Sequence, residues 1–377
     1  MMGAVSRLVA ALAAVALGAC GGGNDDGTTA PGEKTCQQDP TQPKCAVPTT
    51  TLRGLASAKG RSFGVSVDAT FFGANPAAYD VVVAREFNVI VAGNVMKWSS
   101  IHRDSRYSYR WANPDTMVAF AQTNGMKVRG HTLVWYQQNP TWLTGTTWDP
   151  ETLKVVLKEH IDSVVGHYKG KVLAWDVVNE AFNDGTGSLR VTGSPWATTL
   201  GAGYIDLAFQ EARAADPAAL LFYNDYNLET PGLKQDSVFA RISGMKSRGI
   251  PIDGIGFQAH FQVNADATGV PTKETLIATF NRFAALGLKI HVTELDIRVR
   301  TPGATSAELT AQNQGFANVT AACLAVPACE VMVVWGLNDG ESWVNTTFPG
   351  YGQALLFDDS FSRKATYNAV SSALSAP

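Results

Sequence analysis

Short apolar runs alternate with longer amphipathic stretches along most of the chain. Eight of the runs have the length and the β-branched content of strands, and segments with helical spacing lie between them. The predicted strands span residues 63–67, 89–94, 127–135, 172–180, 220–226, 254–260, 289–296 and 331–337. Parallel strands are joined by crossover helices that cover both faces of the sheet, so such strands are apolar along their length. Apolar runs that alternate with helical segments therefore predict an α/β fold.

Eight strand–helix units match the number that closes a (β/α)8 TIM barrel. Two helix starts support this pattern, since Asp149-Pro150 and Asn113-Pro114 each place a capping residue before a proline, and Gly125 would end the second helix. An open doubly wound sheet is the structural alternative, but no glycine-rich dinucleotide fingerprint follows the first strand. We therefore expect a single (β/α)8 domain over residues 52–377.

The first 51 residues have a different composition. Residues 1–19 combine Arg7, an apolar run and small residues, which is typical of a secretory signal peptide too short to span a bilayer. The end of this segment, Leu17-Gly18-Ala19-Cys20, resembles a bacterial lipobox, so we expect Cys20 to carry a lipid that anchors an exported protein at the cell envelope or cell surface. An ordinary signal with an incidental cysteine is the alternative. Residues 20–51 are rich in Gly, Pro and Thr and are predicted to be a flexible tether.

Charge and cysteine content narrow the possible partners. A net charge of −3 with only 17% charged residues leaves no basic surface for nucleic acid. His and Cys are few and scattered, which argues against a metal site. Export permits disulfides. Besides Cys20 there are four cysteines, which allow three connectivities, and the simplest of these joins neighbours in the sequence: Cys36 with Cys45 and Cys323 with Cys329.

The chain also has nine Trp, which could pack in the core or stack on sugar rings.

Two glutamates follow apolar strands at positions where a barrel carries its chemistry. Glu180 ends the fourth predicted strand and Glu294 lies in the seventh, so both side chains are expected at the carboxyl-end mouth of the barrel. Two carboxylates about 5–5.5 Å apart would cleave a glycosidic bond with retention, and about 6.5–9.5 Å would predict inversion. A single glutamate in such a place is more often a structural ion-pair partner. The pair therefore indicates glycoside hydrolysis.

Six longer motifs resemble those of glycoside hydrolase family 10, the barrel xylanases. They occur in the family's order from about residue 52 to the C-terminus, and they span residues 130–135, 175–182, 223–226, 254–260, 292–296 and 334–343. The resemblance implies a retaining endo-β-1,4-xylanase in which Glu180 is the acid/base and Glu294 the nucleophile. It also implies a family disulfide between Cys323 and Cys329, a xylan substrate and no cofactor, and we expect a monomer.

The same resemblance implies a set of residues that bind the substrate: Asn94, Lys97, His131, Trp135, Gln138, Asn179, Tyr226, Gln258, His260, Trp335 and Trp343, with Asp296 in a supporting role. Asn179 is expected to hydrogen-bond a sugar 2-hydroxyl, a contact that strengthens in the transition state. His260 is expected to hold Glu294 ionised. Bulky Trp side chains would exclude the hydroxymethyl group that glucose carries and xylose lacks.

One departure from the family bears on substrate binding. Gly93 stands where the family usually has Glu, which removes a partner for the sugar one unit from the cut and opens space there. We therefore expect weaker binding of that sugar and tolerance of side-chain substituents on it. Two other functions compete: a different retaining β-glycanase, such as an endoglucanase or mannanase, and a non-catalytic glycan-binding lipoprotein. A different β-glycanase should lack the Lys97 motif, and a non-catalytic binding protein should lack one of the two carboxylates. Lys97, Glu180 and Glu294 are all present in this chain.

Overall fold

The computed structural model describes residues 48–68, 71–73 and 77–377. The predicted signal peptide, Cys20, Cys36, Cys45 and nearly all of the predicted tether lie outside these residues. Within them, no helix combines the length and the apolar character needed to cross a membrane.

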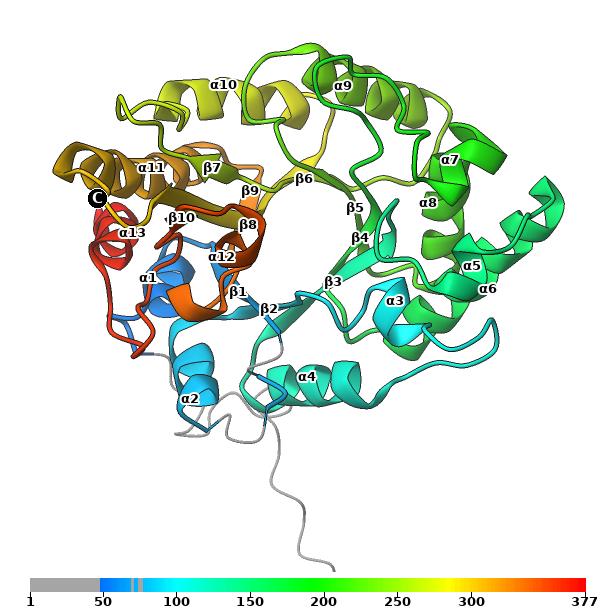
Figure 1. Cartoon of the computed structure of the whole chain (residues 1–377), viewed down its shortest axis with the longest axis horizontal. Helices are drawn as coiled ribbons and strands as arrows, with labels where there is room; N and C mark the ends of the chain where they lie inside the picture. Colours follow the sequence, from blue (N-terminus) through cyan, green and yellow to red (C-terminus); the bar gives the residue numbers. More distant parts are fainter. Residues whose placement is uncertain (1–47, 69–70, 74–76) are drawn as a thin grey trace, which may run out of the picture. The chain divides into compact units, whose positions relative to one another are not determined.

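Eight parallel strands close into a barrel (Figure 1). They are β1 (Ser62–Val67), β2 (Val89–Ala92), β3 (Lys127–Val134), β4 (Ala174–Asn179), β5 (Leu220–Asp225), β6 (Gly254–Phe257), β8 (Lys289–Arg300) and β9 (Cys329–Val334). Each pairs with the next in parallel register, and β9 pairs with β1 to close the sheet. The predicted (β/α)8 barrel is confirmed, with a strand at each of the eight predicted runs.

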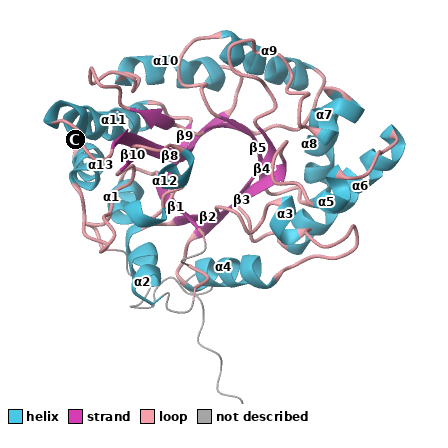
Figure 2. Cartoon of the chain, in the orientation of Figure 1, coloured by secondary structure: helices cyan, strands magenta, loops and turns pink. Residues whose placement is uncertain are grey.

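Helices connect the strands, and the longer helices form an outer ring around the barrel (Figure 2). They are α1 (Leu52–Ala58), α2 (Ala77–Glu86), α3 (Trp98–Ile101), α4 (Ala112–Thr123), α5 (Thr141–Thr144), α6 (Pro150–His167), α7 (Pro195–Leu200), α8 (Gly203–Ala215), α9 (Leu233–Ser247), α10 (Lys273–Ala284), α11 (Ser306–Ala325), α12 (Val344–Thr347) and α13 (Ala365–Ser375), with a 3-10 turn, η2 (Asp339–Glu341). Their apolar faces pack on the strands in one continuous core.

One of the two predicted helix starts is confirmed and the other is wrong. Asp149 caps α6 by accepting the Thr152 N–H, and Pro150 is the first helical residue. In contrast, α4 begins at Ala112, so Asn113 is inside the helix. Pro114 is tolerated there because the N–H groups of the first helical turn have no partner within the helix.

The sixth and seventh predicted strands differ from the structure at their ends. β6 stops at Phe257, and a left-handed residue, Ala259 (φ 60°), bends the chain before β7 (His260–Gln262) begins. β7 pairs with an outer part of β8, which continues to Arg300, and β10 (Tyr351–Gly352) pairs with the end of β8. This extension carries strand residues beyond the barrel mouth, where they can line a binding site.

The predicted disulfide between Cys323 and Cys329 is present. It joins the last part of α11 to the first residue of β9. β9 leads directly to Trp335, so the covalent link braces the strand that delivers this tryptophan.

Candidate active site

A cavity of about 670 Å³ opens at the carboxyl ends of the barrel strands. All the predicted catalytic and substrate-binding side chains line it: Asn94, Lys97, His131, Trp135, Gln138, Asn179, Glu180, Tyr226, Gln258, His260, Glu294, Trp335 and Trp343. Asp296, predicted to be supporting, contacts two of them, His260 and Trp343. Residues from the ends of seven barrel strands and their loops, and from β7, are therefore brought together at one place.

Glu180 is held by three hydrogen bonds at the end of β4. Its Oε2 accepts the indole N–H of Trp135 at 3.0 Å, and its Oε1 accepts from the amides of Gln258 at 3.0 Å and Asn179 at 3.2 Å. The residue is only 8% exposed. These donors fix the direction of the carboxylate toward the cavity.

The backbone of Glu180 is also constrained. It has a left-handed conformation (φ 55°), which is uncommon for a residue with a side chain. The Tyr223 hydroxyl accepts the next N–H, of Ala181, at 3.0 Å and donates to Asp225 at 2.6 Å. Burial raises the pKa of Asp225 to about 7, although Lys234 at 2.7 Å opposes this rise. The buried chain of contacts therefore stabilises the turn that aims Glu180.

Glu294 has a different environment. It is 4% exposed, its Oε1 accepts the Asn224 amide at 2.7 Å, and its Oε2 lies 3.1 Å from His260 Nε2. Burial alone would raise the pKa of Glu294, but the charge of His131, 3.9 Å away, and the hydrogen bond from His260 together lower it. The carboxylate is therefore kept ionised, as a nucleophile requires.

His260 lies between two carboxylates. Its Nδ1 is 2.9 Å from Asp296 Oδ2, and its Nε2 faces Glu294. Burial by itself would lower the pKa of His260, but these two carboxylates outweigh it and raise the pKa to about 10. The imidazolium is thus a fixed positive charge beside Glu294 at neutral pH.

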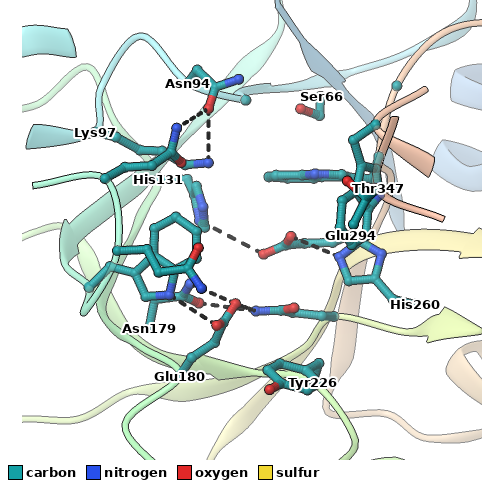
Figure 3. A pocket seen from close by; sticks show the side chains of 18 of the residues that line it. Ser66, Asn94, Lys97, His131, Asn179, Glu180, Tyr226, His260, Glu294 and Thr347 are labelled. Atoms are coloured by element: carbon teal, nitrogen blue, oxygen red, sulfur yellow. Dashed lines mark hydrogen bonds and ion pairs between the residues drawn. The ribbon is translucent and has the colours of Figure 1, made fainter. Parts of the chain in front are cut away.

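A network of amides connects the two glutamates across the floor of the cavity. Asn224 donates to both Glu294 and Asn179 Oδ1, and Asn179 in turn donates to Glu180. In Figure 3 the side chains of Glu180 and Glu294 point into the same open space, with Asn94 at one end and Tyr226 at the other. The arrangement can therefore present two carboxylates to one bound molecule.

The end of the cavity near Asn94 carries a second set of polar groups. Asn94 Oδ1 accepts from Lys97 and Gln138, both at 3.1 Å, while its amide donates to Asp68. A Cβ on Gly93 would lie 3.0 Å from Ser66 Oγ and 3.6 Å from Asp68 Cβ. Space beside Gly93 is thus partly filled from β1, and Asp68 supplies a carboxylate there.

Two aromatic side chains that line the cavity pack against its histidines. Trp335 packs edge-on against His131 with ring centroids 5.2 Å apart, and Trp343 packs against His260 at 4.9 Å. The Trp343 indole also donates to Asp296 at 2.6 Å. Two large rings are therefore held next to the histidines that flank Glu294, where a sugar ring could pack on them.

Replacing His260 by glutamine is expected to move the acid limb of the activity profile to higher pH. The predicted nucleophile Glu294 must be ionised, so activity is expected to fall as pH drops through its pKa. Without the imidazolium, burial and the charge of Asp176 both raise that pKa. The measurement is kcat/KM against pH, with His167→Gln, an exposed histidine of α6, as control. An acid limb at the same pH in His260→Gln would contradict this role.

Several residues of the cavity were not identified from the sequence. They include Ser66, Asp68, Gln137, Asn227, Arg298, Gly336, Glu341, Thr347 and Phe348. Ser66 and Asp68 could have been identified from the sequence, because both are polar residues at the end of the first apolar strand. No group of three or more His, Cys, Asp or Glu suited to a metal ion occurs among the residues described.

Comparisons with known proteins agree with this geometry. The family model "Glycosyl hydrolase family 10" matches residues 51–373. Endo-1,4-beta-xylanase B of Thermotoga neapolitana is 40% identical over 320 residues, which are 85% of this chain and 90% of that protein. Endo-1,4-beta-xylanase 5 of Pyricularia oryzae is 39% identical over 83% of this chain and 76% of its own length.

Solved structures give the same result. Native xylanase 10B from Thermotoga maritima has a TM-score of 0.82 and 40% identity, covering 86% of this chain and 98% of its own. Xylanase 10B from Thermotoga petrophila, solved in complex with xylobiose, has a TM-score of 0.82 and 39% identity, covering 87% and 98%.

Proposed function

This chain belongs to glycosyl hydrolase family 10, and we propose that it is an endo-1,4-β-xylanase that cleaves internal bonds of xylan with retention of configuration. Glu180 acts as the acid/base and Glu294 as the nucleophile. The observation that supports these roles is the contrast between the two glutamates. Both face one cavity, but only Glu294 is flanked by histidines that keep it ionised.

In the first step Glu294 attacks the anomeric carbon while Glu180 gives its proton to the leaving oxygen. The C–O bond to the leaving chain breaks and a bond from carbon to Glu294 forms. Asn179, next to both carboxylates, is suited to hold the 2-hydroxyl as positive charge develops on the sugar.

In the second step the roles reverse at Glu180. Now ionised, it removes a proton from a water molecule, which attacks the same carbon and releases Glu294 as a carboxylate. The imidazolium of His260 stabilises Glu294 as a leaving group, because it favours the charged form. Two inversions at one carbon give overall retention.

Xylan is favoured over cellulose by the shape of the cavity. Trp335 and Trp343 are held by His131, His260 and Asp296, so they have little freedom to move away from a larger sugar. Xylose has no hydroxymethyl group, whereas glucose would bring one into this wall.

We expect the purified protein to release oligosaccharides from xylan roughly 100-fold faster than from soluble cellulose, a ratio typical of discrimination by pocket shape. The measurement is the initial rate of reducing-end release on both polymers at equal mass concentration. Comparable rates would contradict the substrate assignment but leave the glycosidase mechanism in place. Export and lipid attachment at Cys20, and the monomeric state, remain predictions from the sequence.

A further inference from the structure

Arg298 extends the cavity lining beyond the catalytic residues. It lies two residues after Asp296 on the same strand, so both side chains are on one face of β8. In the register between β7 and β8 it is opposite Gln262, just as Asp296 is opposite His260. Arg298 is therefore one step farther out along the wall that carries His260.

Neighbouring side chains hold Arg298 in a fixed position. Its Cζ is 3.7 Å from the centroid of the Phe348 ring, and its Nε donates to Gln262 Oε1 at 3.2 Å. Both Arg298 and Phe348 line the cavity. A guanidinium that is stacked and hydrogen-bonded in this way loses little conformational freedom when it binds a ligand.

The charge of Arg298 has no carboxylate within ion-pair distance among the described residues. Arg300, on the same strand, instead pairs with Glu308 at 2.6 and 2.8 Å. Burial lowers the pKa of Arg298, and Asp296 opposes this only from a distance. Among the described residues the hydrogen bond of Arg298 is made by its Nε, so the donors on its two Nη atoms are left for a ligand in the cavity.

We propose that Arg298 binds the carboxylate of an acidic sugar branch, a uronic acid attached to the xylan backbone. The proposal rests on the xylanase function given above and adds a substituent to its substrate. A planar guanidinium binds a carboxylate through two parallel hydrogen bonds, which matches the free edge of Arg298. A stacked, half-buried cation without a counter-charge is best offset by an anion that the ligand brings.

The competing role for Arg298 is to bind neutral backbone hydroxyls, which also accept hydrogen bonds. That role makes no distinction between an acidic branch and a neutral branch of the same shape. The two roles are separated by comparing a xylo-oligosaccharide that carries one uronic acid with the same compound after reduction of its carboxyl group to a primary alcohol. Plain xylotetraose serves as the reference substrate.

The experiment measures kcat/KM of wild type, Arg298→Gln and Arg298→Lys on these three substrates. We expect wild type to prefer the acidic over the reduced branch by about tenfold, the size of one charge-assisted pair at a half-exposed site. Arg298→Gln should bring that ratio close to 1, and Arg298→Lys should retain part of it. Arg248→Gln, at the residue that follows α9, controls for the change in net charge, because this arginine is paired with Asp206 away from the cavity.

An acidic-to-reduced ratio that is the same in wild type and Arg298→Gln would overturn the proposal. So would an equal loss by Arg298→Gln on all three substrates, because it would assign Arg298 to the backbone sugars. Failure of the wild type to cleave plain xylotetraose would instead contradict the proposed xylanase function, so the two failures are distinguishable.

Discussion

Glu294→Ala is expected to lower kcat on xylan by roughly 10⁴-fold or more, the scale of loss when a group that forms a covalent intermediate is removed. This corresponds to about 5 kcal/mol of transition-state stabilisation. Glu180 cannot take its place, because its carboxylate is held by three hydrogen-bond donors. The measurement is steady-state kcat on xylan, with thermal unfolding to show that the variant is folded.

A second measurement on Glu294→Ala is the product that it forms when azide is added. A small anion can enter the space left by the carboxylate and attack the anomeric carbon once, while Glu180 still protonates the leaving oxygen. The product should then be a glycosyl azide of inverted configuration. Glu330→Ala is the matched control, since this strand carboxylate pairs with Lys289 at the other end of the barrel. A kcat for Glu294→Ala within tenfold of wild type would exclude Glu294 as the nucleophile.

Glu180→Ala is expected to lower kcat on xylan by about 10²–10⁴-fold, the usual contribution of general acid catalysis. The loss should depend on the leaving group. An aryl xylobioside whose phenol has a low pKa needs no proton to depart, so its first step should stay fast. The second step should remain slow because no base activates the water.

Pre-steady-state kinetics separate the two steps for this variant. We expect a burst of phenol equal to the enzyme concentration, followed by slow turnover, as the covalent intermediate accumulates. Wild type measured in parallel on the same aryl xylobioside should have a faster steady state, because its Glu180 activates the water of the second step. If Glu180→Ala lost the same factor on xylan and on the aryl glycoside, Glu180 would not be the acid.

The sequence predicted the barrel and the positions of its catalytic groups for a simple physical reason. Strands buried on both faces must be apolar along their length, so a polar side chain at their end stands out. Glu180 after β4 and Glu294 within β8 both follow this rule, and the structure brings both to one cavity. The longer motifs that resemble family 10 then predicted the substrate-binding residues around the two glutamates.

Contacts made between distant segments could not be predicted in the same way. Asp68 supports Asn94 from a different strand, so the glycine at position 93 does not leave the site without a carboxylate. Tyr223 reads as a core aromatic in the sequence, yet its hydroxyl holds the N–H that follows Glu180. At the bend, the Ala259 N–H donates to the buried carboxylate of Glu229 at 2.7 Å, a distant contact, and an Ala gives no local signal for a left-handed residue.

Arg298 was missed because the seventh predicted strand stopped at residue 296. Beyond it the sequence alternates between apolar and basic residues, which is typical of an exposed edge strand rather than of a barrel interior. Pairing with β7 and β10 turns this segment into part of the cavity wall. The acidic-branch proposal therefore depends on tertiary structure alone.

Trapping of the covalent intermediate tests the assignment of the nucleophile most directly. A xylobiosyl fluoride with fluorine at C2 forms the intermediate but hydrolyses it slowly, because the fluorine destabilises the positive charge that develops on the sugar. Mass spectrometry of the treated protein should show one added disaccharide, and peptide mapping should find it on Glu294. A label on Glu180 or on any other residue would contradict the roles assigned to the two glutamates.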